Sequence, residues 1–346
     1  MIHHLIFDGV ADGPLGIGLD VVGAAARVVE ARRAPAGPAL RQRVRSIDGE
    51  PVRSAAGRLC AVDGALGPRT LRRGDVLVLP GLGMPTPPTI TAALERPDVA
   101  AGVERVARAA ASGVQIAASC SATFVLAAAG VLDGRRATTT WWLAPLFRQR
   151  FPRVLVESER MMVESGPVLS AGAAFAHADL MLAVVARVAG PTVAHTVARY
   201  LLLDERSSQA RYMMMGHLAA ADPLLRRLEA FIGKNLDRQV TIDEMARAVA
   251  TSPRTLARKV AAGVGVTPQR FAQRLRVARA VHLLDTTRRP IEAIAGEVGY
   301  ADPAAFRRVF REETGETPGA RRRRSLLRGE EAASDAAASD AAPTRR

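Results

Sequence analysis

The apolar positions between Pro290 and Arg324 recur every three or four residues, which is the spacing of one buried face of a helix. A first short helix is predicted from the stripe Ile291, Ile294, Ala295 and Val298. Gly299 suits the left-handed residue that ends a helix, while Asp302 and Pro303 are typical of the cap and first residue of a second helix. A short helix, a tight turn and a second helix form a helix-turn-helix layout.

The second of these helices has two different faces. Phe306 and Phe310 point to one side, whereas Arg307, Arg308 and Arg311 point to the other. An exposed row of arginines on the second helix of such a unit is typical of the helix that enters the major groove of DNA. Alternatively, these residues are only a solvated surface.

The same pattern occurs some 49 to 50 residues earlier, in residues 241–268. Thr241 and Glu244 form a capping box, and Ser252-Pro253 opens a second helix as Asp302-Pro303 does. Both copies end in a Gly-x-Thr-Pro sequence. The chain therefore contains two helix-turn-helix units, at about 241–266 and 290–316. The predicted DNA-contacting residues are those on the outer faces of the two second helices: Arg254, Thr255, Arg258, Lys259, Ala304, Ala305, Arg307, Arg308 and Arg311.

A longer helix over 268–284 is predicted to join the two units. Its expected buried stripe comprises Phe271, Leu275 and Ala278, with Arg270, Arg274 and Arg276 pointing outward. A stiff connecting helix would fix the distance between the two recognition helices. Two successive major grooves on one face of DNA lie about 34 Å apart.

The N-terminal part shows a different pattern, in which short apolar strands alternate with amphipathic helices. This alternation predicts an α/β domain with a flavodoxin-like, mainly parallel sheet sandwiched by helices, followed by an all-α domain. The predicted division is an N-terminal domain over 1–205, a linker over 206–222, and a DNA-binding domain over 223–325. The Ala/Ser/Asp-rich residues 326–346 are expected to be disordered.

Cys120 lies where a predicted apolar strand turns directly into a small-residue helix. Open α/β sheets bind ligands at this carboxyl edge, so Cys120 and Ser121 are candidate ligand-binding residues. Gly81 and Gly83 follow a neighbouring strand, where backbone N–H groups could point to the same place as in an oxyanion hole. The helix dipole is expected to lower the pKa of the thiol.

The C-terminal segment from about Leu224 to Arg324 resembles the DNA-binding domain of AraC-type transcription regulators. The matching residues of the second unit are Ala295, Gly299-Tyr300, Asp302, Phe306, Arg308, Phe310, Gly315, Thr317 and Pro318. The resemblance implies two recognition helices in successive major grooves on one face of promoter DNA.

The N-terminal part resembles the PfpI-like branch of the class I glutamine amidotransferase-like superfamily, in the GlxA-type arrangement that precedes an AraC-type domain. The resemblance is carried by residues 75–83, 118–139 and 150–154, the region of Trp142, and 169–172. Ser121 and Thr140 stand where histidines are common in the superfamily or in these regulators. Asp20 is kept in the first helix, and Asp20 and Thr140 complete the candidate ligand site.

Because a cysteine nucleophile needs a base within reach, the interpretation from these residues is a regulator and not an enzyme. Its N-terminal domain would sense a small-molecule effector or form a homodimer. The alternatives are a PfpI-like cysteine hydrolase or hydratase carrying a DNA-binding domain, and a DNA-binding structural protein whose first domain only dimerises. No cofactor or metal is predicted, since the histidines and cysteines lack metal-ligand spacing.

The charge of the chain supports a nucleic-acid partner. The net charge is +14, and residues 222–328 hold 22 Lys and Arg against 12 Asp and Glu, a net of +10. A basic excess concentrated on the repeated segment favours a polyanion. Two cysteines in 346 residues are typical of a reducing cytoplasm, and neither a signal peptide nor a membrane span is predicted.

Overall fold

The computed structural model describes residues 1–31, 40–83, 85–204, 206–220 and 222–325. The chain forms two compact units, one comprising Met1–Met213 and the other beginning at Met214. The predicted linker over 206–222 is divided between them. Its first part belongs to the N-terminal unit because the buried Gln209 side chain donates hydrogen bonds to the carbonyl oxygens of Thr139 and Ser158, at 3.0 and 2.9 Å.

A six-stranded sheet forms the centre of the N-terminal unit. Its strand order is β2-β1-β5-β6-β10-β9, and every neighbouring pair is parallel except β10 and β9. Four of its strands are completely or almost completely buried because helices cover both faces. The strands are β1 (Ile2–Leu5), β2 (Gln42–Arg45), β5 (Val76–Leu79), β6 (Gln115–Ser119), β9 (Met162–Ser165) and β10 (Val168–Ala171).

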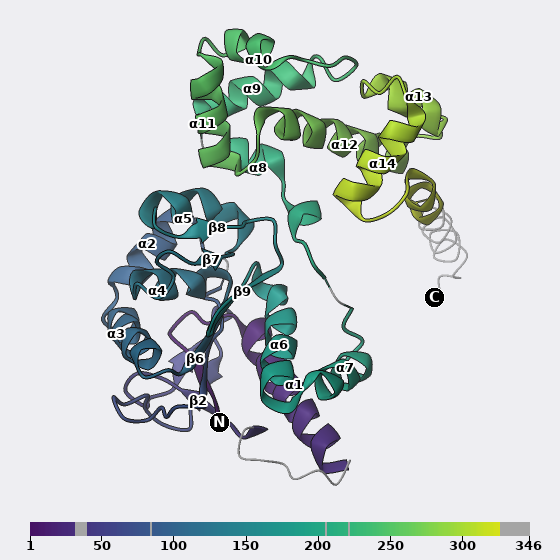
Figure 1. Cartoon of the computed structure of the whole chain (residues 1–346). Helices are drawn as coiled ribbons and strands as arrows, with labels where there is room; N and C mark the ends of the chain where they lie inside the picture. Colours follow the sequence, from purple (N-terminus) through teal and green to yellow (C-terminus); the bar gives the residue numbers. More distant parts are fainter. Residues whose placement is uncertain (32–39, 84, 205, 221, 326–346) are drawn as a thin grey trace, which may run out of the picture. The chain divides into compact units, whose positions relative to one another are not determined.

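Helices cover the two faces of this sheet (Figure 1). One face packs against α1 (Asp12–Ala31), α6 (His177–Ala189) and α7 (Pro191–Tyr200). The other packs against α2 (Pro87–Glu95), α3 (Pro97–Ala111), α4 (Thr123–Ala128) and α5 (Ala144–Arg150). The predicted α/β architecture is therefore confirmed.

Four shorter strands form two small sheets outside the main one. The pair β3 (Val52–Arg53) and β4 (Leu59–Cys60) is antiparallel, whereas β7 (Arg136–Ala137) and β8 (Leu155–Val156) are parallel. Residues 162–171 form the hairpin of β9 and β10, because Gly166 turns the chain at φ +63°.

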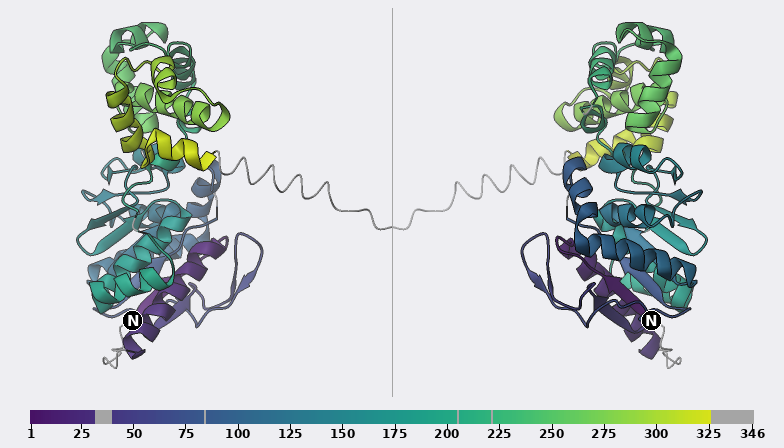
Figure 2. Two further views of the ribbon diagram at one scale, coloured as in Figure 1. Left: turned by 90° about the vertical axis from the view of Figure 1, so that its right-hand side faces the viewer. Right: turned by 90° about the vertical axis from the view of Figure 1, so that its left-hand side faces the viewer.

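The second unit consists of packed helices (Figure 2). Thr241, Ser252, Thr267 and Asp302 all accept backbone N–H bonds as helix caps, as their positions in the sequence predict. The helices are α8 (Met215–Ala219), α9 (Pro223–Gly233), α10 (Ile242–Ala248), α11 (Pro253–Val264), α12 (Pro268–Thr286), α13 (Ile291–Glu297) and α14 (Pro303–Thr314).

The predicted faces of the connecting helix α12 need correction. Arg274 and Arg276 are buried, and Ala278 is exposed. The physical reason is that both guanidinium groups have partners inside the unit. Arg274 donates to Glu313 of α14, and Arg276 donates to the loop between α9 and α10. Apolar periodicity alone cannot predict which arginines find such partners.

Of the helices that the structure describes, none combines the length and the apolar character that crossing a membrane requires.

Candidate functional site

Helix α11 presents basic side chains on its outer face. Arg254 and Arg258 are exposed, and neither forms an ion pair within the described part of the chain. Lys259 is also exposed, but its ammonium group lies 3.4 Å from the carboxylate of Asp222, the cap of α9. Thr255 is half-buried, and its backbone N–H donates to the capping oxygen of Ser252. Arg254 and Arg258 are therefore the guanidinium groups of α11 that are free for another molecule.

Helix α14 has a similar outer face. Arg308 and Arg311 are exposed and form no ion pair with any described residue, whereas Arg307 lies 2.5 Å from Glu292 of α13. Ala304 and Ala305 occupy the first turn, where both backbone N–H groups donate to the Asp302 carboxylate. Their small side chains leave the surface of this turn open to close approach.

Arg258 and Arg308 occupy corresponding positions in the two helices. Each lies six residues after the capping residue, which is Ser252 in α11 and Asp302 in α14. Both helices end at a glycine in the left-handed conformation, Gly265 and Gly315. The duplicated sequence pattern thus produces two helices with the same start, the same end and an equivalent free guanidinium group. A guanidinium can bind a phosphate or pair bidentately with guanine.

The turn at Cys120 follows β6 as predicted, but it is closed. Cys120 has φ +54°, an uncommon conformation for a residue other than glycine, and it is fully buried. Its backbone N–H donates to the carbonyl of Gly172 at 2.7 Å. A Cβ atom at Gly81 would lie 2.8 Å from the Cβ of Cys120, so glycine is required there by close packing. Cys120 and Gly81 therefore lie next to each other, as the sequence predicts.

The expectation that a helix dipole lowers the pKa of the Cys120 thiol is wrong. Burial raises the pKa of this thiol, and the nearby Ser121 and Thr140 offset the effect only in part. The helix dipole is weak here because the chain first makes a 3-10 turn over Cys120–Ala122, and α4 then has only six residues. The thiol is therefore protonated near neutral pH.

The other residues predicted for this site differ in their exposure. Ser121 and Thr140 are fully buried. Ser121 Oγ accepts a hydrogen bond from the backbone N–H of Leu82 at 2.8 Å. This N–H lies between Gly81 and Gly83 and is therefore not available to a ligand as an oxyanion-hole donor. A Cβ at Gly83 would lie 3.1 Å from Ala55, and Asp20 is exposed on α1. The carboxylate of Asp20 is therefore not a base for the buried thiol.

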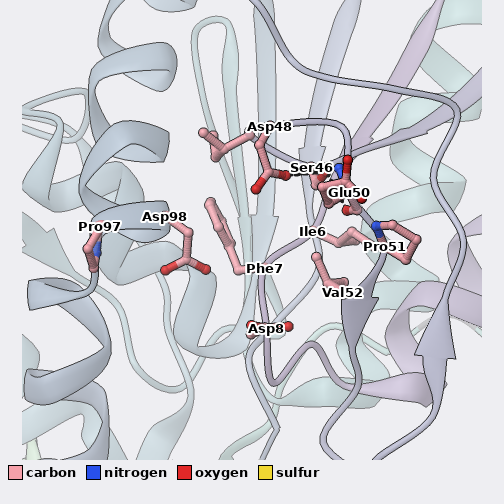
Figure 3. A pocket seen from close by; sticks show the side chains of 11 residues that line it. Ile6, Phe7, Asp8, Ser46, Asp48, Glu50, Pro51, Val52, Pro97 and Asp98 are labelled. Carbon is pink, nitrogen blue, oxygen red and sulfur yellow. Dashed lines mark hydrogen bonds between the residues drawn. The ribbon is translucent and has the colours of Figure 1, made fainter.

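An open cavity of about 460 Å³ lies elsewhere on the carboxyl edge of the sheet, beyond the ends of β1 and β2. The apolar side chains that line it include Ile6, Phe7 and Val52 (Figure 3). Asp98, from the first turn of α3, lies across the Phe7 ring from Asp48 and Glu50. The lining residues are Ile6, Phe7, Asp8, Ser46, Ile47, Asp48, Glu50, Pro51, Val52, Pro97 and Asp98. None of the predicted ligand residues is among them.

The ionisable side chains that line this cavity are all carboxylates. Asp98 is bound by the guanidinium of Arg96, whose Nε donates at 3.0 Å. A hydrogen bond from the backbone N–H of Glu50 holds the pKa of Asp48 below its usual range, so Asp48 is ionised at neutral pH. Sequence reasoning missed this cavity because its walls come from three separated segments. The available signal was the polar residues directly after β1 and β2.

A buried histidine pair was also missed. His4 of β1 and His177 of α6 are fully buried on either side of Gly18, where a Cβ would lie 3.0 Å from His177 Nε2. His177 Nδ1 and Ser119 Oγ are 2.9 Å apart, and His4 Nε2 is 3.1 Å from Gln42 Oε1. Burial lowers the pKa of His4 to about 4 and that of His177 to about 3. Both side chains are therefore neutral near pH 7.

Family models match both halves of the chain. The DJ-1/PfpI family matches residues 19–187, and a helix-turn-helix domain matches residues 245–324. The HTH-type transcriptional regulator CdhR of Pseudomonas aeruginosa is 28% identical over 281 residues, which cover 80% of each chain. The chain belongs to the AraC-type regulators that carry a DJ-1/PfpI domain. The resemblance of each half is thus confirmed.

A second relative agrees with this family. The HTH-type transcriptional regulator GlxA of Rhizobium meliloti is 32% identical over 221 residues, which cover 62% of this chain and 66% of GlxA. An AraC family transcriptional regulator from Pseudomonas putida has a solved structure that matches with a TM-score of 0.48 and 22% identity. That match covers 58% of this chain and 98% of the other. As an AraC-type regulator, the chain has a C-terminal domain for binding DNA.

Proposed function

We propose that this AraC-type regulator reads promoter DNA with the outer faces of α11 and α14, and that Arg258 and Arg308 make equivalent contacts in two successive major grooves. The observation that carries the proposal is the matched position of these two guanidinium groups, both exposed and without an ion pair in the described chain. Arg254 and Arg311 extend the same faces. We expect Lys259 and Arg307 to contribute less to DNA binding, because each already has a carboxylate partner.

The experiment compares DNA binding by the wild type, Arg258→Ala and Arg308→Ala on a protected site mapped upstream of the protein's own gene. Loss of a base contact should weaken specific binding by about 1–3 kcal/mol, and loss of a phosphate contact should reduce the log–log salt slope by about one. Arg279→Ala is the matched control, because Arg279 is an exposed arginine on α12 paired with Glu297. Equal affinity of all four proteins would contradict the assignment.

We further infer that the N-terminal domain receives a small effector in the cavity beyond β1 and β2. The cavity is of the size that small molecules occupy, and it lies at the edge where open α/β sheets bind ligands. The side chain of Cys120, by contrast, is fully buried. The carboxylates and apolar side chains that line this cavity favour a ligand with a positive charge and an apolar body.

A thermal-shift comparison tests the effector site. Protonated alkylamines of three to six carbons should raise the melting temperature, and carboxylates of the same chain length should not. Glu50→Gln and Asp48→Asn should reduce the amine effect. Asp20→Asn should not, since Asp20 is exposed on α1 and is not one of the residues that line the cavity. Loss of the response only in Asp20→Asn would place the ligand near the originally predicted residues and overturn the cavity proposal.

The proposal includes a homodimer formed through the N-terminal domain, and it assigns no turnover to Cys120. Support for the second point is the burial of the thiol and its raised pKa. Light scattering of the full chain and of residues 1–213 tests the dimer. A full chain that is monomeric at micromolar concentration would refute it.

A further inference from the structure

Arg276 is a buried arginine in the middle of the helix that joins the two helix-turn-helix units. Only 3% of its surface is exposed, so it cannot contact DNA directly. Its Nη1 donates to Gln239 Oε1 at 2.8 Å, and its Nη2 donates to the backbone carbonyl of Arg238. Both acceptors belong to the loop between α9 and α10, which leads directly into the first helix-turn-helix unit.

The same loop lies directly against the turn between α13 and α14, in the second helix-turn-helix unit. Gln239 Nε2 donates to the carbonyl of Gly299 at 3.2 Å. A Cβ atom at Gly299 would lie 2.6 Å from the carbonyl oxygen of Leu236 and 3.1 Å from the backbone nitrogen of Arg238. The loop that leads into the first helix-turn-helix unit therefore contacts the second unit through backbone, in addition to the connection that α12 makes.

A buried arginine such as Arg276 is uncommon at a position where the side chain only has to fill space. Removing a guanidinium from water costs several kcal/mol, and an apolar side chain of similar volume is often as stabilising. The planar fork of arginine instead fixes the direction and distance of its two acceptors. Since both acceptors lie in one loop, the position of that loop on α12 is set by geometry as well as by packing.

We propose that Arg276 and Gln239 are positioning residues that hold the two recognition helices in one fixed relation, so that the protein accepts one spacing between its two half-sites. This inference rests on the proposed reading of DNA by α11 and α14. It assigns a role in operator specificity to two residues outside both recognition helices. Without these hydrogen bonds, fewer contacts restrain the two units, and bending of α12 changes the distance between the two recognition helices.

The test measures affinity for the mapped operator and for a version with two base pairs inserted between the half-sites. The wild type should lose about 100-fold in affinity on insertion, because only one recognition helix then binds at a time. Arg276→Met retains the side-chain stem and removes the fork, and Gln239→Ala removes the bridge from an exposed position. Both variants should lose less than about tenfold on insertion and should bind an isolated half-site as the wild type does.

Arg279→Met is the matched control, because it removes an exposed arginine from the same helix and should keep the wild-type spacing penalty. Circular dichroism verifies folding, and Gln239→Ala keeps the test decisive if Arg276→Met is unstable. A full spacing penalty in Gln239→Ala and folded Arg276→Met, or equal wild-type affinity for both spacings, would overturn the inference. Failure of the wild type to bind any operator would instead refute the DNA-reading proposal.

Discussion

Gly299 and the carbonyl oxygen of Leu236 are so close that any side chain at residue 299 would collide with the backbone, since its Cβ would lie 2.6 Å from that oxygen. Gly299 also has φ +79°, which disfavours other residues. The corresponding turn of the first unit contains Ala250 at φ +55°. The two copies therefore share a left-handed turn residue, but the second copy alone combines this conformation with a demonstrated backbone contact that demands glycine.

Gly299→Ala is predicted to lower the free energy of unfolding of the C-terminal unit by about 2–3 kcal/mol, because backbone strain and the collision with Leu236 act together. Urea unfolding followed by circular dichroism measures the change. Gly296→Ala is the control: Gly296 is in α13, and a Cβ there meets no atom within 4 Å. It should be neutral or stabilise by up to about 1 kcal/mol. Similar effects of both substitutions would show that the contact with Leu236 is unimportant.

The pair His4 and His177 should make the N-terminal unit sensitive to acid. Their pKa values are lowered to about 4 and about 3, against about 6.5 in an unfolded chain. Below pH 6.5 the unfolded chain binds protons that the folded unit does not. The free energy of unfolding is therefore highest above this pH and decreases as the pH falls. At pH 5.5 the loss should be about 1.5 kcal/mol per histidine.

Urea unfolding at pH 7.5 and 5.5 measures this effect. His177→Gln should reduce the difference between the two pH values, whereas His195→Gln should preserve it because His195 is exposed on α7. An equal pH dependence in the wild type and His177→Gln would contradict the assignment to this pair.

Cys120 should react slowly with iodoacetamide at pH 7.5, because its thiol is buried and its raised pKa keeps it protonated. Cys60 also has a pKa raised by burial, but its side chain is only half-buried. Mass spectrometry of the folded protein should therefore find Cys60 modified first, and unfolding in urea should remove the difference. Rapid stoichiometric labelling of Cys120 would revive the cysteine-enzyme alternative.

Gln209 should hold the end of the N-terminal unit in place. Gln209→Ala removes the donor to the carbonyl oxygens of Thr139 and Ser158 and is predicted to cost about 1–3 kcal/mol. Trypsin should then cleave faster after Arg206 or Arg211. Gln115→Ala, at the start of β6, is a control for loss of a half-buried glutamine elsewhere in the unit. Unchanged cleavage in Gln209→Ala would show that this side chain is not the anchor.

The sequence alone determined the features that depend on neighbouring residues. The capping box of Thr241 and Glu244, the caps at Ser252 and Asp302, and the left-handed Gly299 were all predicted, because caps and turns are decided within a few residues. The alternation of strands and helices likewise predicted the α/β fold. The repeat predicted two similar helices, and so the exposed faces that carry Arg258 and Arg308.

Only the tertiary structure decided the properties that depend on distant segments. Arg274 and Arg276 are buried because Glu313 and the loop at Gln239 lie 39 and 37 residues away and supply their partners. The pKa of Cys120 rises because surrounding elements exclude water, and the hydrogen bonds of Ser121 and Thr140 to the thiol offset this only in part. The cavity forms where the ends of β1 and β2 meet the start of α3. Local sequence patterns contain helix and turn preferences, but desolvation and partner choice are set by the folded chain as a whole.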